Sequence, residues 1–388
     1  MTNPFNPKHP VEPIFFVNRK EILNTFIRTL KRSVEAKPDN LAVLGDWGLG
    51  KTSVLRKFES IALTQLKGIK IFSAFVELTP ATSKDFTSFI TRVRDEIERS
   101  FKVVDLPILA KLKKEIIPNW RIRSVDFGIT LERREQEKRN RSSVTIFEDT
   151  LRDLWETLVS LKIDIVLLCI DDLHYLAQQH PDALYDIRGV FQRLAMDGCK
   201  YYLAVSAKDL LFFRAKEFAE PFTRFFDRFK LDTFDLEGTR NAITNPLRLS
   251  KSSIMVDEEV ILRIHKLTQG HPYFIHFIMQ DLVELKEKGA LTNEFFYANY
   301  PKIAKHLARE KFDDDLHLAS EMDQRVLFEM AKFNKTEVTP SELKSKSARV
   351  ALRRLVNDKG LVKKNGRGRY HIYHPLFKQY LRIRGEQE

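Results

Sequence analysis

The first 235 residues alternate between short apolar runs and longer stretches whose apolar positions recur as on one face of a helix. Nearly continuous apolar runs, which suit strands covered on both faces, predict strands at 41–44, 69–76, 163–170 and 200–205. Helical spacing predicts helices at about 19–36, 83–99, 147–161 and 182–196, and another that starts at Ser53. Strands separated by helices in this way favour an α/β fold with a doubly wound parallel sheet.

Beyond residue 235 the strand signals stop, and helical spacing continues to about residue 333 with one break at Gly270-His-Pro272. The last stretch predicts helices at 322–333, 340–344 and 346–357, then strands at 360–364 and 369–373 around a turn at 365–368. Three helices followed by a hairpin are the layout of a winged helix-turn-helix. We therefore expect a core at 1–235, a helical domain at 236–320 and a winged-helix domain at 321–388.

Residues 102–146 fit this alternation poorly. Residues 125–131 alternate like a strand, and 132–141 form a dense run of charges that includes four arginines. A charged run of this kind is either a solvated loop or a contact for a polyanion, and the sequence leaves both open.

Composition narrows the class of protein. The 388 residues are 43% hydrophobic and 30% charged, and no window approaches 18 consecutive apolar residues, so we expect no membrane span. The start lacks the layout of a secretory signal, and Cys169 and Cys199 stand in apolar, strand-like surroundings. Both features favour a cytoplasmic protein with buried thiols over a disulfide or a metal site. The net charge of +12 favours a polyanionic partner.

The strand at 41–44 runs into the pattern G-x-x-x-x-G-K-[ST], formed by Gly45, Gly50, Lys51 and Thr52. Glycines let backbone N–H groups turn toward phosphate oxygens, and the helix that follows directs its positive end at the same anion. Lys51 would reach the β- and γ-phosphates and Thr52 would hold Mg²⁺. The predicted cofactors are ATP and Mg²⁺, and the predicted phosphate-binding residues are Gly45, Asp46, Trp47, Gly48, Leu49, Gly50, Lys51, Thr52 and Ser53.

Asp171 and Asp172 follow the apolar run at 163–170, at the strand end where parallel sheets place their ligands. An apolar strand that ends in two aspartates also precedes many ordinary helices. After a phosphate-binding loop, however, the pair predicts that Asp171 holds Mg²⁺ and that Asp172 polarises the attacking water.

Other polar residues near strand ends carry two interpretations each. Ser206 and Lys208 would face the γ-phosphate from the side, or are a turn serine and a solvent lysine. Arg224 or Arg228 would reach the nucleotide of a neighbouring subunit, which implies a homo-oligomer, or would form a surface salt bridge. His271 is either a nucleotide contact or a helix cap. His174 is predicted to lie in the core or behind the site.

Six segments in this order resemble the archaeal ATPase family, whose AAA+-like members are close to signal-transduction ATPases and to archaeal origin-recognition initiators. They are Phe16-Val-Asn-Arg19, the loop at 45–52, Ile170-Asp-Asp172, Val205-Ser-Ala-Lys208, Gly270-His-Pro-Tyr273 and His374-Pro-Leu-Phe377. The resemblance implies a P-loop ATPase core, a helical lid and a C-terminal winged helix. It also implies that Arg19 helps to hold adenine and that Pro272 touches the base.

Basic residues concentrate at the C-terminal end: 336–388 hold 13 Lys and Arg against 5 Asp and Glu. We expect double-stranded DNA as the partner, because basic residues on a recognition helix and a wing would neutralise phosphates along a groove. The candidates are Lys346, Arg349, Arg353 and Arg354 on the helix and Lys363, Lys364, Arg367 and Arg369 on the wing.

The expected function is therefore that of an ATP-binding and ATP-hydrolysing protein that acts on DNA. The alternative is a nucleotide-gated signalling or defence switch, in which the winged helix is an autoinhibitory or partner-binding module. An inactive scaffold is disfavoured because Lys51, Thr52 and Asp171 are all in place.

Overall fold

The computed structural model describes residues 3–103, 143–208, 224–286, 288–345 and 347–386. The chain divides into two compact units, one of residues 9–232 and one of residues 1–8 together with 233–388. Residues 104–142, which make up most of the poorly patterned stretch at 102–146, and Lys346 lie outside the described residues, so the two interpretations of the charged run at 132–141 stay open.

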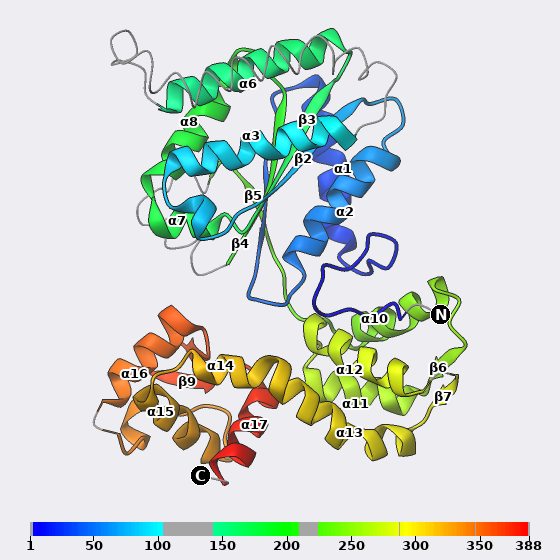
Figure 1. Cartoon of the computed structure of the whole chain (residues 1–388), viewed down its shortest axis with the longest axis vertical. Helices are drawn as coiled ribbons and strands as arrows, with labels where there is room; N and C mark the ends of the chain where they lie inside the picture. Colours follow the sequence, from blue (N-terminus) through cyan, green and yellow to red (C-terminus); the bar gives the residue numbers. More distant parts are fainter. Residues whose placement is uncertain (1–2, 104–142, 209–223, 287, 346, 387–388) are drawn as a thin grey trace. The chain divides into compact units, whose positions relative to one another are not determined.

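A five-stranded parallel sheet forms the centre of the unit at 9–232 (Figure 1). Its order is β2-β3-β4-β1-β5, with bounds β1 Leu41–Leu44, β2 Ile71–Glu77, β3 Ile165–Asp171, β4 Tyr201–Ala207 and β5 Asp227–Lys230. All pairings are parallel, as the sequence predicts. Because β3 and β4 lie between β2 and β1, the loop after β1 opens beside the carboxyl ends of β4 and β3.

Helices cover both faces of the sheet, as the α/β pattern predicts. They are α1 Lys20–Glu35, α2 Lys51–Thr64, α3 Phe86–Val103, α6 Ser143–Ser160, α7 His174–Gln179 and α8 Asp182–Met196, with a 3₁₀ turn at Ala81–Ser83. Alternate strand residues explain the two layers. Ala42 and Leu44 pack with α3, α6 and α8 on one face, whereas Leu41 and Val43 pack with α1 and α2 on the other (Figure 1). Cys169 and Cys199 are both buried with free thiols, which confirms the predicted burial.

Sequence analysis missed β5, because it predicted no strand between 205 and 235. The strand reads Asp-Arg-Phe-Lys and is largely exposed. It lies at the edge of the sheet and pairs only with β1, so it needs no apolar run.

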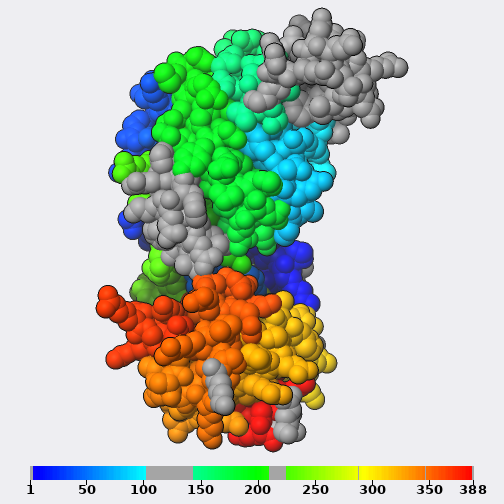
Figure 2. Space-filling model, turned by 90° about the vertical axis from the view of Figure 1, so that its left-hand side faces the viewer, coloured from blue at the N-terminus to red at the C-terminus, as the bar shows by residue number. Residues whose placement is uncertain are grey.

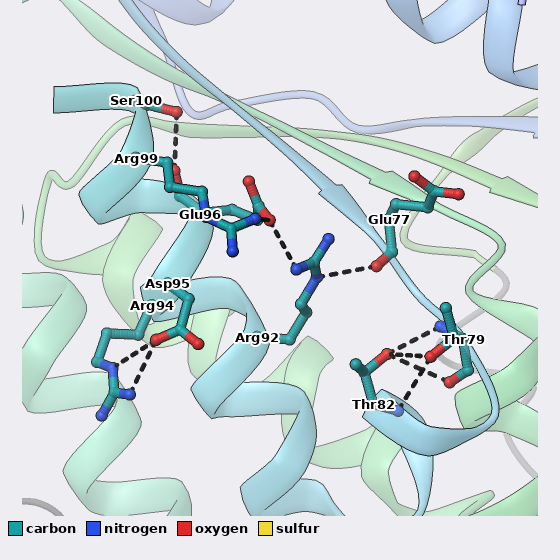
Figure 3. A network of polar contacts seen from close by, with 9 residues as sticks. All are labelled: Glu77, Thr79, Thr82, Arg92, Arg94, Asp95, Glu96, Arg99 and Ser100. Atoms are coloured by element: carbon teal, nitrogen blue, oxygen red, sulfur yellow. Dashed lines mark hydrogen bonds and ion pairs between the residues drawn. The ribbon is translucent and has the colours of Figure 1, made fainter. Parts of the chain in front are cut away.

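Polar contacts of α3 fix the end of β2 beside the end of β3 (Figure 3). The Arg92 side chain donates to the carbonyl oxygen of Glu77 at 3.1 Å and pairs with Glu96 on its own helix. Glu77 lies in register with Asp171, and the next residue, Leu78, donates its N–H to the Asp171 carbonyl at 3.2 Å. The backbone of Asp171, the last residue of β3, is therefore hydrogen-bonded to the residue that follows β2.

The unit that contains 233–388 is mostly helical. Its first part holds α10 Leu236–Leu249, β6 Ile254–Val256, α11 Glu258–Thr268, α12 Pro272–Leu285, β7 Gly289–Leu291, α13 Asn293–Leu307, a π-turn at Ala308–Phe312 and α14 Asp313–His317. The expectation that strand signals stop after residue 235 is wrong here, because β6 and β7 pair in parallel. Strands of three residues are too short to leave a recognisable period in the sequence.

The last part contains α15 Glu321–Lys332, a 3₁₀ turn at Pro340–Glu342, α16 Ala348–Arg354, a π-turn at Leu355–Lys359, β8 Val362–Asn365, β9 Arg369–Ile372 and α17 Pro375–Gly385. The antiparallel β8–β9 hairpin lies where the sequence predicts it. A single apolar core runs from Phe274 and Phe277 through Val326 and Leu352 to Phe377, so this part shares its core with the helices before it.

His374 caps α17, a helix that the sequence analysis did not predict. Its Nδ1 accepts the N–H of Leu376 at 3.1 Å, and its Nε2 lies 2.9 Å from the carbonyl oxygen of Thr268. A neutral imidazole satisfies both contacts, with Nε2 as the donor. Burial lowers the pKa of His374 to about 4, which keeps the ring neutral near pH 7.

Among the described helices, none is long and apolar enough to cross a membrane.

Candidate nucleotide-binding site

The loop at 45–52 forms a turn between β1 and α2. Gly45 donates its N–H to the Ala207 carbonyl at 3.2 Å, and a Cβ on Gly45 would lie 3.3 Å from atoms of Leu231 and Leu49. Gly50 caps α2 with φ 89°, a conformation that costs glycine little, and the space that a Cβ would occupy is open. Leu49 is buried in the core, whereas Asp46 and Trp47 are exposed. The loop is thus anchored by one apolar side chain and leaves an open space in front of Gly50.

Lys51 is the first residue of α2 and is 8% exposed. Its Nζ donates to the carbonyl oxygen of Asp46 in the same loop at 3.0 Å. Burial lowers its pKa, and the carboxylates of Asp172 and Asp171 oppose that shift. A buried ammonium with one neutral partner and two carboxylates nearby can gain further charge-assisted hydrogen bonds from an anion.

Asp171, the last residue of β3, is 2% exposed, and Ser206 on the neighbouring strand β4 donates its hydroxyl to Oδ1 of Asp171. The same Ser206 oxygen accepts the N–H of Asp172 at 3.0 Å. Ser206 is fully buried. Its hydroxyl donates to Asp171 and orients that carboxylate, and the expected position of Ser206 beside the γ-phosphate stays a prediction.

Asp172 stands next to this pair with its backbone at φ 56° and its side chain 32% exposed. Left-handed backbone is tolerated by Asp more readily than by most residues. Burial, together with the charge of Asp171, raises the pKa of Asp172 to about 6. The structure thus brings Lys51, Asp171, Asp172 and Ser206 together at one end of the sheet, where the sequence analysis places all four.

The residues expected near the base lie in different units. Arg19 precedes α1 and donates to the carbonyl oxygen of Asp232, and burial lowers its pKa. Pro272 is buried at the start of α12 in the other unit, directly after His271, the N-cap. The roles of Arg19 and Pro272 at the base stay predictions.

Arg224 and Arg228 lie toward the amino-terminal end of the sheet. Arg224 precedes β5, and Arg228 lies in register with Ala42 of β1, before the loop begins. The preceding residue, Asp227, donates its N–H to the Asn40 carbonyl at 2.8 Å, which places this segment beside the start of β1. Arg224 therefore lies at the end of the sheet opposite to the phosphate loop of its own chain.

Six of the predicted DNA contacts are exposed: Arg349, Arg353, Lys363, Lys364, Arg367 and Arg369. Figure 2 shows residues around 350 (orange-red) at the surface of their unit. Arg369 lies 3.5 Å from Glu337. Arg354 differs from the others, because its Nε and Nη2 bind Asp323, which is 1% exposed. Arg354 thus forms an ion pair within the unit, and its expected role as a DNA contact stays a prediction.

Sequence reasoning missed Asp323 and the positioning role of Ser206. Ser206 could have been found, since it follows an apolar strand that a P-loop fold places beside β3. Asp323 leaves no such signal, because it lies 31 positions from Arg354 in the chain.

These features define a P-loop NTPase with a parallel sheet core, and comparison with known proteins agrees. Residues 19–209 match the model of the KAP family P-loop domain. No curated protein sequence matches the chain. The resemblance stated from the sequence is confirmed for the fold: the chain has a P-loop NTPase fold and is similar to the KAP family P-loop domain and to solved archaeal ATPase and origin-recognition structures.

Two solved structures illustrate the relationship. The Walker-type ATPase paby2304 of Pyrococcus abyssi is 15% identical, with a TM-score of 0.56, over 95% of this chain and 100% of that one. The ORC2 protein of Aeropyrum pernix, solved as ADPNP–ADP complexes, is 12% identical, with a TM-score of 0.59, over 97% of this chain and 98% of that one. At such identities the likeness shows the fold alone.

Proposed function

We propose that this protein binds ATP with Mg²⁺, hydrolyses it, and acts on double-stranded DNA through its basic C-terminal part. The observation that carries the proposal is the convergence of four groups at one end of the sheet. They are the loop that begins at Gly45, the buried ammonium of Lys51, the Ser206–Asp171 pair and the partly buried carboxylate of Asp172.

The residues present fit both cofactors. Gly50 opens onto free space, and Lys51 donates to one carbonyl oxygen, that of Asp46, which phosphate oxygens could replace. Thr52 and Asp171 supply a hydroxyl and a carboxylate, the oxygen ligands that Mg²⁺ prefers. The hydrogen bond from Ser206 would keep the Asp171 carboxylate oriented for this purpose.

The chemistry would be hydrolysis of the γ-phosphate. The oxygen of a water forms a bond to the γ-phosphorus, the bond to the β,γ-bridging oxygen breaks, and ADP leaves with the electron pair. Asp172 would orient this water and accept its proton as inorganic phosphate forms, while Lys51 would neutralise charge on the phosphates. Bound Mg²⁺ would offset further negative charge on the phosphate oxygens.

The DNA-binding part of the proposal is supported by charge and layout. We assign 236–320 to a helical lid and 321–388 to a winged helix, with α16 as the recognition helix and the β8–β9 hairpin as the wing. Exposed cations lie on both elements, including Arg349 and Arg353 on α16 and Lys363 and Lys364 on β8. Such residues suit phosphate contacts along a groove.

The alternative is a nucleotide-gated switch. It is favoured by the core that joins Phe274 and Phe277 of α12 to Phe377 of α17, because a change that moves α12 would carry the C-terminal part with it. Binding of the free protein to duplex DNA at low salt separates the two functions. The DNA-acting function requires such binding, and the switch does not.

Calorimetric titration of ATP with and without Mg²⁺ tests the site. We expect Asp171→Asn to lose most of the Mg²⁺ dependence of ATP binding. Asp172→Asn should bind Mg·ATP like the wild-type protein but turn it over more slowly. If Asp172→Asn hydrolyses ATP at the native rate, the water-orienting role belongs to another residue. If the wild-type protein does not bind ATP, the proposal as a whole fails.

A further inference from the structure

His174 is buried beside the candidate site with neither ring nitrogen satisfied. It is the first residue of α7, and its side chain is 2% exposed. Among the residues that the structure describes, neither Nδ1 nor Nε2 has a hydrogen-bond partner. An unmade hydrogen bond of a buried polar group costs about 1–3 kcal/mol, so such a group calls for an explanation.

The carboxylate of Asp172 lies close to this imidazole, with Nδ1 of His174 3.6 Å from Oδ1. That separation is just beyond a hydrogen bond, and a shift of less than 1 Å would close it. The Asp172 side chain makes no hydrogen bond in the described parts of the chain, although its backbone N–H donates to Ser206. Asp171 is oriented by Ser206, whereas the Asp172 carboxylate faces the imidazole of His174 at this distance.

The surroundings of His174 keep its ring neutral. Burial first, and then the charges of Lys208 and Lys51, lower its pKa to about 3. A neutral imidazole carries one N–H, so it can donate from Nδ1 to a carboxylate while Nε2 remains an acceptor. The ring also packs against Tyr175, with centroids 4.4 Å apart, which limits its rotation. The ring is therefore a fixed donor, and it cannot compete with Asp172 as a proton acceptor.

We propose that His174 is a positioning residue for ATP hydrolysis, which donates from Nδ1 to Asp172 and holds that carboxylate toward the attacking water. The inference rests on the proposed ATPase function. It assigns His174 no contact with the substrate. An apolar core role would require only the volume of the ring, whereas the positioning role requires a donor at the place of Nδ1.

Three substitutions separate these roles. His174→Phe keeps the ring volume and removes the donor. His174→Asn places an amide N–H near the position of Nδ1, and His174→Gln places one near Nε2. His276→Phe is the matched control, because His276 is also buried with an unpartnered Nδ1 but lies in α12 of the other unit. Mg·ATP affinity, kcat and the melting temperature are measured for each variant and for the wild-type protein.

We expect His174→Phe to lose about tenfold or more in kcat, the effect of one charge-assisted hydrogen bond, with Mg·ATP affinity unchanged within about twofold. The His174→Asn variant should retain more activity than His174→Gln, and His276→Phe should turn over ATP at the native rate.

Two outcomes would overturn the inference while leaving the ATPase proposal intact. They are a native kcat in His174→Phe and equal activity of His174→Asn and His174→Gln. Equal losses of affinity and kcat would show a structural role instead. Should His174→Phe fail to fold, the Asn and Gln pair decides alone. A wild-type protein without ATP binding would overturn the proposed function, and this inference with it.

Discussion

Ser206 and Asp171 lie 35 positions apart in the chain, and the hydroxyl of the first donates a hydrogen bond to the carboxylate of the second. They meet because β3 and β4 are neighbours in the sheet and end at the same edge. The oxygen of Ser206 also accepts the backbone N–H of Asp172. One buried hydroxyl therefore connects the two acidic residues of the candidate site.

Removing this hydroxyl should weaken the metal site more than the fold. In Ser206→Ala, Asp171 loses its donor and becomes free to rotate, so we expect the Mg²⁺ concentration for half-maximal turnover to rise roughly tenfold, the effect of about 1.4 kcal/mol. Turnover at saturating Mg²⁺ should change less. Ser73→Ala, a buried serine on β2 whose hydroxyl donates to Glu59, is the control. An unchanged Mg²⁺ requirement in Ser206→Ala would count against Asp171 as the metal ligand.

Arg353 and Arg354 are neighbours in the chain with different expected roles. Arg354→Ala leaves the buried Asp323 without its cation, so it should lower the melting temperature clearly. Arg353 is exposed and forms no ion pair with the described residues. Arg353→Ala should keep the native melting temperature and flatten the salt dependence of DNA binding by about one unit.

Thermal melts and binding to two unrelated duplexes over a salt series check both expectations. If Arg353→Ala leaves the salt slope unchanged, α16 does not lie against the phosphates. Tight binding to only one of the duplexes would point to base reading instead.

His374 should make the stability of its unit depend on pH. Its pKa is lowered from 6.5 to about 4, so the unfolded chain takes up a proton at a higher pH than the folded one does. Stability is then complete above about pH 6.5 and falls as the pH drops toward 4, by roughly 3 kcal/mol in all. His276, with a pKa also lowered to about 4, acts in the same direction.

His374→Asn can still cap α17 through its side-chain oxygen but cannot titrate. The difference in unfolding free energy between pH 7 and pH 4.5 should therefore be smaller in this variant than in the wild-type protein, measured by denaturant titration at both pH values. Identical pH dependence in the two proteins would show that His374 does not carry the effect.

If Arg224 or Arg228 contacts a nucleotide, we expect it to be the nucleotide bound by another subunit. Arg224 precedes β5, at the amino-terminal end of the sheet and away from its own phosphate loop. A mixture of Arg224→Ala or Arg228→Ala protein with Lys51→Ala protein should then regain part of the ATPase activity that each variant lacks. With assembly shown by sedimentation, failure to regain activity at every mixing ratio would leave both arginines as structural residues.

The sequence predicted most directly those features that depend on residues close together in the chain. The spacing of Gly45, Gly50, Lys51 and Thr52 between an apolar run and a helix marked the phosphate loop, and the run ending at Asp171 marked the strand beside it. Four of the five strands of the main sheet were predicted, because buried parallel strands are apolar throughout.

What the sequence did not reveal depends on contacts between distant residues. The polar strand β5 is recognisable only through its pairing with β1. A basic side chain such as that of Arg354 indicates charge but not that a buried Asp323 will bind it. His174 was expected in the core or behind the site and is buried, yet its nitrogens beside Asp172, without a hydrogen-bond partner among the described residues, emerge only from the folded geometry.

The most direct test of the central claim is equilibrium binding of Mg·ATP to Lys51→Ala, with Lys67→Ala, an exposed lysine beyond α2, as the control. Lys51 would bind the phosphates through charge-assisted hydrogen bonds, each worth about 1.5–3 kcal/mol, so its loss should weaken ATP binding roughly ten- to a hundredfold. The melting temperature without nucleotide should not fall, since the substitution removes a buried charge and no core packing. Lys67→Ala should bind ATP like the wild-type protein. ATP affinity in Lys51→Ala equal to that of the wild-type protein would contradict the assignment of this loop as the phosphate site.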